Sequence, residues 1–225
     1  FSAIDTAKLN VEKNLENAKE LFQSKLNEIF NQKSEGWVEK RLLDVCYLKS
    51  GSSVPISLEK SSGDIAYVKV ADMNLEENKF SIGTSSRFLD FKDINDRGIF
   101  PEGAVIFPKR GGAIATNKKR ITRIPICADL NVMGAISSEQ IIPQFLHYYF
   151  LGFNLLDIAN GTTILQINNY SFDDLNISLP VDFESQNDIV QLLDNLRLKI
   201  QSLESKYQQE LNSLEAVSYT HLTLP

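Results

Sequence analysis

The sequence predicts an α+β fold in which a mixed-sheet domain is flanked by two long helices that pack as an antiparallel coiled coil. Near both ends of the chain, apolar residues recur every three or four positions among polar ones. Residues 37–183 instead contain short β-branched and aromatic runs bounded by Gly, Pro, Asn or Asp. Hydrophobic residues make up 43% of the chain and charged residues 23%, which is typical of a globular protein and excludes a disordered or fibrous one. The sequence has no run of about 18 apolar residues, so we expect no membrane span.

Residues 1–36 are expected to form the first long helix, with its regular part over about residues 5–33. Leu21 and Phe30 widen the apolar stripe near its end. Ser34 to Gly36 should stop the helix, with Gly36 suited to a left-handed C-cap. The stripe itself consists of Val11, Leu15, Ala18, Phe22, Leu26 and Ile29.

Residues 184–216 are expected to form the second helix. Ser185 and Asp188 have the spacing of a capping box, although Asp replaces the favoured Glu. Two sets of apolar residues repeat every seven positions, as in a coiled coil. Pairing with the first helix would bury both stripes, and the alternative is that each helix docks separately on the domain. The repeating sets are Ile189, Leu196 and Leu203, and Leu193, Ile200, Tyr207 and Leu214.

The two ends of the chain carry separate expectations. The first residue is Phe1 and not Met, which suggests that the chain starts inside a longer reading frame. Residues 217–225 break the heptad pattern and resemble a translated cloning tail, so we expect them to be non-native and set His221 aside.

Within the central region, four segments are expected to be strands of a mixed or antiparallel sheet. A helical segment follows over about residues 143–159, and its aromatic side chains are expected to be core residues. The expected strands are Ile65–Val70, Phe80–Ile82, Ala104–Phe107 and Ile121–Ile124.

No catalytic centre is evident. Apart from His221, the only histidine is His147, which lies inside the apolar helix, and no phosphate-binding loop or cofactor-binding glycine pattern is present. Cys46 and Cys127 are far apart in sequence and neither belongs to a CxxC motif, so no zinc site is indicated and a reducing cytoplasm fits best. We therefore expect a non-enzymatic protein without a cofactor.

Two other functions stay open. An acidic residue, Asp64 or Asp72, is followed by an ExK triplet that begins at Glu77 and ends at Lys79. This pattern is typical of a metal-dependent nuclease. The same stretch is also typical of a turn between strands. Alternatively, the chain is a coiled-coil adaptor whose central domain binds protein.

The clearest binding signal is the concentration of basic residues between Gly103 and Ala128, a stretch without any acidic residue. The whole chain has a net charge of −6, so one positive face could bind DNA while the remainder stays acidic. Arg can contact guanine bidentately and Asn can contact adenine, which makes Asn117 and Thr116 candidate base readers. Lys69 and Arg87 are candidate flanking contacts, and a solvated basic hairpin is the alternative. The basic residues are Lys109, Arg110, Lys118, Lys119, Arg120 and Arg123.

Several stretches, taken in order, resemble the specificity subunits of Type I restriction-modification systems. Each is short, but their order and spacing over about residues 18–200 make the combination specific. They are Ala18–Phe30, Trp37 with Leu42–Val45, Ile65–Asp72, Pro101–Phe107, Arg110–Ile114, Phe145–Leu146, Gly161–Thr163, and Leu179–Pro180 with Gln186 and Ile189–Val190.

The resemblance implies a target-recognition domain at residues 37–183 that reads one half of a split double-stranded DNA target. The helices would act as a spacer, methyltransferase subunits would dock on them, and a separate restriction subunit would supply nuclease and translocation. The order helix, domain, helix resembles the C-terminal half of such a subunit. Two copies could also pair through their helices and imitate a whole one.

Overall fold

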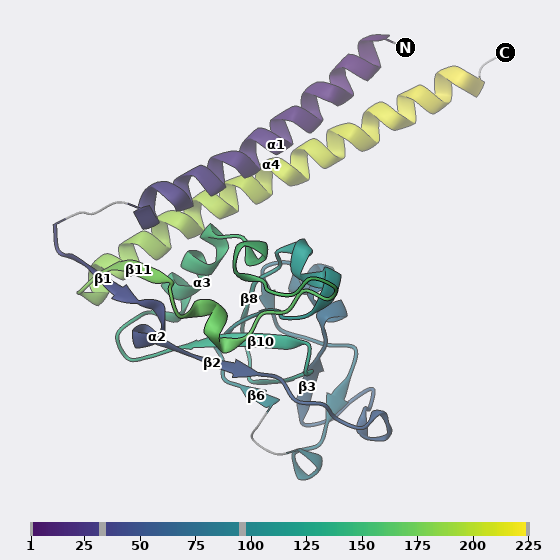
Figure 1. Ribbon diagram of the computed structural model, residues 1–225. Coiled ribbons are helices and arrows are strands. Elements are labelled where there is room, and N and C mark those ends of the chain that lie inside the picture. Colours follow the sequence, from purple (N-terminus) through teal and green to yellow (C-terminus); the bar gives the residue numbers. More distant parts are fainter. Residues whose placement is uncertain (1, 32–34, 95–97, 224–225) are drawn as a thin grey trace.

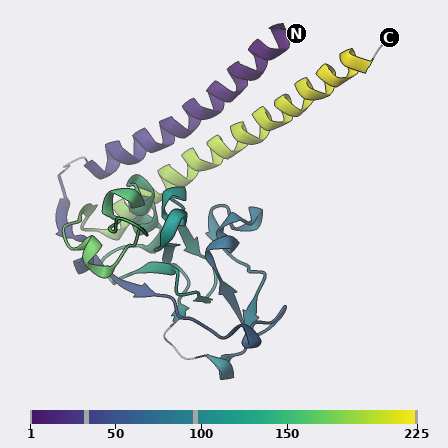
Figure 2. The same ribbon diagram turned by 45° about the vertical axis from the view of Figure 1, so that its right-hand side comes forward.

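The computed structural model describes residues 2–31, 35–94 and 98–223, and its most prominent feature is a pair of long helices. Helix α1 (Ser2–Asn31) and helix α4 (Phe183–Thr223) lie side by side in opposite directions, as predicted (Figures 1 and 2). At 1.5 Å per residue, their 30 and 41 residues correspond to about 45 and about 60 Å. Among the described residues, no helix combines the length and apolarity needed to cross a membrane.

Helix α1 buries the stripe expected from its sequence. Val11, Ala18, Leu26 and Ile29 are all buried. Leu21 was expected to widen the stripe, but its side chain is 58% exposed, so this prediction is wrong. The helix ends at Asn31, and the expected boundary at Lys33 and Ser34 lies outside the described residues. Gly36 has a φ of 82° and belongs to the turn that leads into the domain.

Helix α4 begins one residue before the expected start. The Asp182 carboxylate accepts a hydrogen bond of 2.7 Å from the Ser185 backbone N–H, so Asp182 caps the helix and Ser185 does not. Leu193 and Ile200 are buried as expected, whereas Leu203 is 39% exposed and falls outside the seam. The helix continues past residue 216 to Thr223, and the non-native origin of residues 217–225 stays a prediction.

Within the described residues, the strands of the domain form three sheets. Two strands, β1 and β11, pair beside the helices; five strands have the order β2-β10-β7-β8-β4, and four have the order β5-β3-β9-β6. The β4–β8 and β3–β9 pairs are parallel and the others antiparallel, which confirms the mixed sheet. The strands are β1 (Trp37–Arg41), β2 (Cys46–Ser50), β3 (Ile65–Val68), β4 (Ser81–Ile82), β5 (Phe88–Leu89), β6 (Ile99–Phe100), β7 (Val105–Pro108), β8 (Arg120–Thr122), β9 (Ile126–Ala128), β10 (Val132–Ser137) and β11 (Asn176–Pro180).

Both faces of the five-stranded sheet are buried. In β7, Val105 and Phe107 point into a core shared with the helices, while Ile106 points into a second core shared with the four-stranded sheet. This alternation follows from the two-residue period of a strand. Gly134 of β10 lies against the Phe100 ring, where a Cβ atom would come within 2.7 Å of a ring carbon. The hairpin that extends from β7 is therefore anchored in the centre of the domain.

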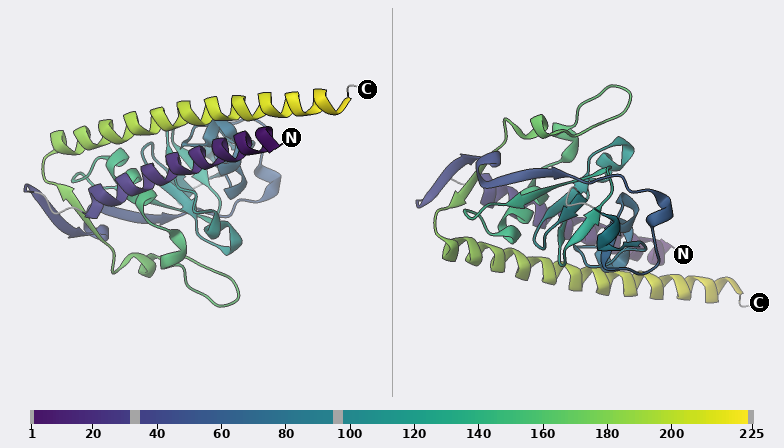
Figure 3. Two further views of the ribbon diagram at one scale, coloured as in Figure 1. Left: turned by 90° about the horizontal axis from the view of Figure 1, so that it is seen from above. Right: turned by 90° about the horizontal axis from the view of Figure 1, so that it is seen from below.

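Helix α3 (Pro143–Gly152) joins the sheets to the helix pair, which covers one side of the domain (Figure 3). The Phe30 ring of α1 packs edge-on against Phe145, with 5.3 Å between centroids. The long helices thus pair with each other, as predicted, and the pair also docks on the domain. The short helix α2 (Leu42–Val45) links β1 to β2.

Helix α3 is shorter than the sequence indicated. Phe153 has extended backbone, and the Asn154 side chain accepts a hydrogen bond of 3.0 Å from Leu156 N. That side chain caps a separate 3-10 turn, η7 (Leu155–Ile158), so the continuous helix expected to residue 159 ends at Gly152.

Candidate functional site

The basic stretch forms a wide hairpin, here called the basic hairpin and defined as residues 105–123. Strand β7 leads into Lys109 and Arg110, then into the 3-10 helix η6 (Gly111–Thr116), and the chain returns along β8. Strands β7 and β8 are antiparallel, with Ile106 opposite Arg120. A structured hairpin rooted on a buried strand therefore presents these residues.

Two other segments hold the basic hairpin in place. On one side, Gly111 N donates to Leu165 O at 2.8 Å and Ile167 N donates to Lys109 O at 2.9 Å. On the other side, the Asn117 side-chain oxygen accepts a hydrogen bond of 2.9 Å from Leu155 N. Asn117 has a φ of 52°, a left-handed conformation that Asn tolerates better than most residues. Asn117 thus helps to hold the hairpin in place, and its role as a base reader stays a prediction.

Two of the six predicted phosphate contacts point inward. Lys119 is only 1% exposed, and its ammonium group donates to the Phe153 carbonyl oxygen and lies 5.3 Å from the Phe153 ring centroid. Burial lowers the pKa of Lys119 to about 7, although Asp157 opposes the shift. The Arg120 guanidinium donates to Asn78 O at 2.8 Å and to Lys119 O at 2.9 Å, and burial lowers its pKa. Sequence reasoning could not foresee this, because the carbonyl oxygens that receive the two side chains belong to Phe153 and Asn78, which are distant in sequence.

The other four basic residues are accessible or bound to neutral partners. Arg110 and Arg123 are exposed. Lys109 Nζ donates to the Ser50 hydroxyl at 3.0 Å, and Lys118 Nζ donates to the Asn74 side-chain oxygen. In the part of the chain that the structure describes, none of these four forms an ion pair with a carboxylate. Their positive charge is therefore left uncompensated.

These four residues do not form one compact patch. The β7–β8 register places Arg123 beyond the Val105–Ile121 pair, at the Gly103 end of the hairpin. Lys109, Arg110 and Lys118 lie at the opposite end, around η6. Thr116 is also exposed there, with its hydroxyl donating to Ala113 O at 2.7 Å. The η6 end, with Lys109, Arg110, Thr116 and Lys118, is the larger candidate binding surface.

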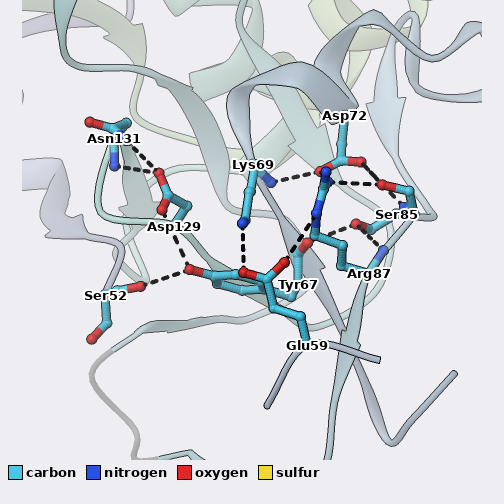
Figure 4. A network of polar contacts seen from close by, with 10 residues as sticks. Ser52, Glu59, Tyr67, Lys69, Asp72, Ser85, Arg87, Asp129 and Asn131 are labelled. Carbon is cyan, nitrogen blue, oxygen red and sulfur yellow. Dashed lines mark hydrogen bonds and ion pairs between the residues drawn. The ribbon is translucent and has the colours of Figure 1, made fainter. Parts of the chain in front are cut away.

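Lys69 and Arg87, the predicted flanking contacts, belong to a polar network on the four-stranded sheet (Figure 4). Lys69 Nζ lies 2.6 Å from one Glu59 carboxylate oxygen, and Arg87 Nε lies 3.2 Å from the other. Arg87 also lies 3.6 Å from the Asp72 carboxylate. Because carboxylates already neutralise both side chains, Lys69 and Arg87 are weaker candidates for an anionic partner than the η6 end.

The same network bears on the predicted nuclease site. Asp72 is 2% exposed, and its carboxylate accepts hydrogen bonds from Lys69 N at 2.8 Å and Ser86 N at 3.2 Å. Glu77 is exposed, and Lys79 lies 3.7 Å from the Glu76 and Glu204 carboxylates. Within the described residues, no cluster of three or more acidic, His or Cys side chains could hold a metal ion. The alternative Asp64 accepts a hydrogen bond from Phe91 N at 3.0 Å.

The joint between domain and helix pair contains a buried residue whose role sequence spacing did not show. Gln186 is 0% exposed; its side-chain oxygen accepts from Ile142 N at 2.9 Å, and its amide donates to Pro180 O at 3.0 Å. It therefore fixes the first turn of α4 against β11 and the start of α3. The only available signal was its place within the family resemblance, because a lone Gln carries no pattern of its own.

Comparisons with known proteins agree with this architecture. Residues 34–213 match the family model described as Type I restriction modification DNA specificity domain. One solved structure comes from work on complex assembly and conformational transition of the type I R-M system. It matches with a TM-score of 0.81 and 17% identity, covering 96% of this chain and 53% of that one. The HsdS subunit from Thermoanaerobacter tengcongensis matches with a TM-score of 0.71 and 17% identity, covering 98% of this chain and 54% of that one.

A third structure, the Type I restriction-modification S subunit from M. genitalium, matches with a TM-score of 0.59 and 13% identity, covering 97% of this chain and 56% of that one. The chain thus spans about half the length of these solved structures. No curated protein sequence matches it. At these identities the structural matches establish the fold, and the family model establishes the kinship.

Proposed function

Because this chain belongs to the Type I restriction modification DNA specificity domain family, we propose that its central domain reads one half of a bipartite duplex DNA target without catalysing a reaction. Within such a complex, methyl transfer and cleavage would fall to other subunits. The full sequence has no cofactor-binding glycine loop, which is compatible with this division of labour.

The uncompensated basic residues at the η6 end carry this proposal. Lys109 and Lys118 bind neutral oxygen atoms and Arg110 is exposed, so all three retain charge that phosphates can neutralise. Leu165 and Ile167 hold the backbone of the basic hairpin, and Leu155 N holds the Asn117 side chain, so these side chains have a fixed origin. Arg110 is the best candidate for contact with a base edge, since it combines exposure with a bidentate donor pair.

The helix pair supports the second part of the proposal, which is that modification subunits dock on α1 and α4. Both helices retain large apolar side chains that the domain does not cover, a composition that favours a protein partner. A restriction subunit would join that assembly, or a second copy of this chain could occupy the same surface. The exposed residues are Leu9 and Leu21 on α1, and Leu192, Leu198 and Leu203 on α4.

The metal-dependent nuclease is less well supported. Its central carboxylate, Asp72, is buried and already accepts two backbone hydrogen bonds, so it lacks free lone pairs directed at solvent for a divalent ion. Incubation of the protein with supercoiled plasmid and Mg²⁺ tests this alternative. We expect binding without nicking, and nicking that is lost in Glu77→Gln would overturn our assignment.

The DNA proposal is tested by measuring affinity against salt concentration. The probe is a pool of fluorescent 40-base-pair duplexes, selected from random sequences by their binding to the protein. The unselected pool is the reference. Arg110→Gln and Lys118→Gln should each reduce the slope of log affinity against log salt by about one. Lys25→Gln on α1 is the matched control, because Lys25 pairs with Glu28 at 2.6 Å far from the hairpin in sequence.

Binding that is insensitive to salt, or slopes that match the control, would overturn the proposal and favour the protein-binding adaptor. The titration should be repeated with a Type I modification subunit present. Leu192→Asp with Leu198→Asp should weaken co-purification with that subunit and leave the salt slope of the isolated chain unchanged.

A further inference from the structure

A cavity of about 540 Å³ lies where the helix pair meets the domain, apart from the η6 end. Helices α1, α3 and α4 form its walls, and the segment from Lys79 to Ser81 together with β8 closes it. Cavities of 300–1,000 Å³ suit small organic ligands. Neither the family assignment nor the DNA proposal uses this space.

The charge of the cavity is positive. Asp194 and Glu204 are its acidic residues, and each is already paired, with Arg197 at 2.9 Å and with Lys79 at 3.7 Å. Among the described residues, the other basic residues in its wall have no carboxylate partner. Lys19 and Arg123 are exposed, whereas Lys119 and Arg120 are directed at backbone carbonyl oxygens. An anion would therefore find uncompensated positive charge here.

Aromatic and aliphatic side chains form much of the remaining surface. Two cations lie over the Phe80 ring: the Arg197 guanidinium is 5.3 Å and the Lys79 ammonium 5.7 Å from the ring centroid. The Phe22 and Tyr148 rings meet edge to face at 6.3 Å, and both line the cavity. A planar ring bound beside these side chains would gain apolar burial and aromatic contacts.

His147 supplies a second, independent indication of a ligand. It lines the cavity, and within the described part of the chain its Nε2 is the buried side-chain polar atom that lacks a hydrogen-bond partner. Burial lowers the pKa of His147 to about 4, although a hydrogen bond with the Lys119 backbone opposes the shift, so the ring is neutral at pH 7. A neutral imidazole has one acceptor nitrogen, and Nε2 can take that role for a ligand N–H or O–H group that displaces the atoms covering it.

We propose that this cavity binds a small aromatic anion of the nucleoside monophosphate class. Its ring would lie among Phe22, Phe80 and Tyr148, and its phosphate would face the exposed cations Lys19 and Arg123. A base or ribose donor would satisfy His147 Nε2. Such a ligand would contact α1, α4 and the domain together, and would stabilise their relative position.

The test is calorimetric titration of the full chain with AMP, adenosine and inorganic phosphate. We expect AMP to bind, and adenosine and phosphate each to bind at least about tenfold more weakly, because each supplies half of the contacts. Gln201→Trp should fill the cavity and weaken AMP binding about tenfold or more. Gln191→Trp, on the same helix but outside the cavity, is the matched control and should bind as the parent does.

The charge requirement has its own pair of variants. Lys19→Gln should weaken AMP about threefold and leave adenosine unchanged, whereas Lys13→Gln, exposed on the same helix outside the cavity, should change neither. Absence of AMP binding, or equal binding by Gln201→Trp and Gln191→Trp, overturns the proposal. Displacement of AMP by the selected DNA duplex also overturns it, since the cavity would then belong to the DNA surface. None of these three results affects the salt test of the hairpin.

Discussion

The Tyr148 hydroxyl donates a hydrogen bond of 2.5 Å to the Asp194 carboxylate, and this bond joins α3 of the domain to α4. Arg197 completes the group, with Nε donating to the Tyr148 hydroxyl at 3.3 Å and a terminal nitrogen 2.9 Å from Asp194. Because these groups are partly buried, the contacts resist solvent better than the surface ion pairs of α1 do. The position of the helix pair relative to the domain depends on them.

Tyr148→Phe should lower the free energy of unfolding by about 1.5–2 kcal/mol, because it removes a charge-assisted hydrogen bond and leaves Asp194 with one partner fewer. Urea denaturation followed by circular dichroism measures the loss. Tyr47→Phe is the matched control, since Tyr47 is 56% exposed and should change stability by less than about 0.5 kcal/mol. Equal losses in the two variants would contradict the assigned role.

The stability of the protein should depend on pH through His147, whose pKa burial lowers from 6.5 to about 4. The unfolded chain binds a proton more readily than the folded one, so stability is complete above pH 6.5 and declines as the pH falls toward 4. A shift of that size corresponds to roughly 3 kcal/mol. The free energies of unfolding of the parent and of His147→Phe should be measured at several pH values. Their difference should change between pH 6.5 and 4, and a constant difference would contradict the role of His147.

Lys118 and Lys119 are adjacent in sequence but should behave differently. Lys118→Met should reduce the salt slope of duplex binding by about one, while Lys119→Met should leave the slope unchanged, because the Lys119 ammonium group is buried against Phe153. Duplex titrations at several salt concentrations separate the two. A reduced slope in Lys119→Met, with the fold intact by circular dichroism, would restore Lys119 as a DNA contact.

Asn117→Ala should cost about 1–2 kcal/mol of stability, because the left-handed backbone is strained in Ala and the bond to Leu155 N is lost. Glycine adopts the left-handed backbone conformation without strain, so Asn117→Gly should lose less stability than Asn117→Ala. If Asn117 instead reads a base, Asn117→Gly would change the preferred DNA sequence, which repeated selection from the random pool would reveal.

The sequence predicted those features of the fold that depend on periodicity. Val11 and Leu26 follow the helical period, and Val105 to Phe107 form a strand. Leu203 was placed wrongly because α4 packs against α3 and the domain as well as against α1, so its buried edge departs from a simple two-helix seam. A heptad pattern describes one partner only.

The candidate site was harder to predict, because its character depends on contacts between distant segments. Leu155 and Leu165 hold the basic hairpin, and neither lies near it in sequence. Charge count alone could not separate Arg110, which is exposed, from Lys119, which is buried. The cavity was not anticipated either, since its walls come from both long helices and the domain.

The fixed backbone of the basic hairpin has a thermodynamic consequence. A loop that is ordered before it meets DNA loses little conformational entropy on association, so more of the contact energy appears as affinity. Its binding should also show a heat-capacity change no larger than the buried contact area accounts for, without the additional contribution of coupled folding. Discrimination between DNA sequences would then arise from the side chains that this hairpin carries, and new specificities could arise by exchanging them while the hydrogen bonds to residues 155 and 165 are kept.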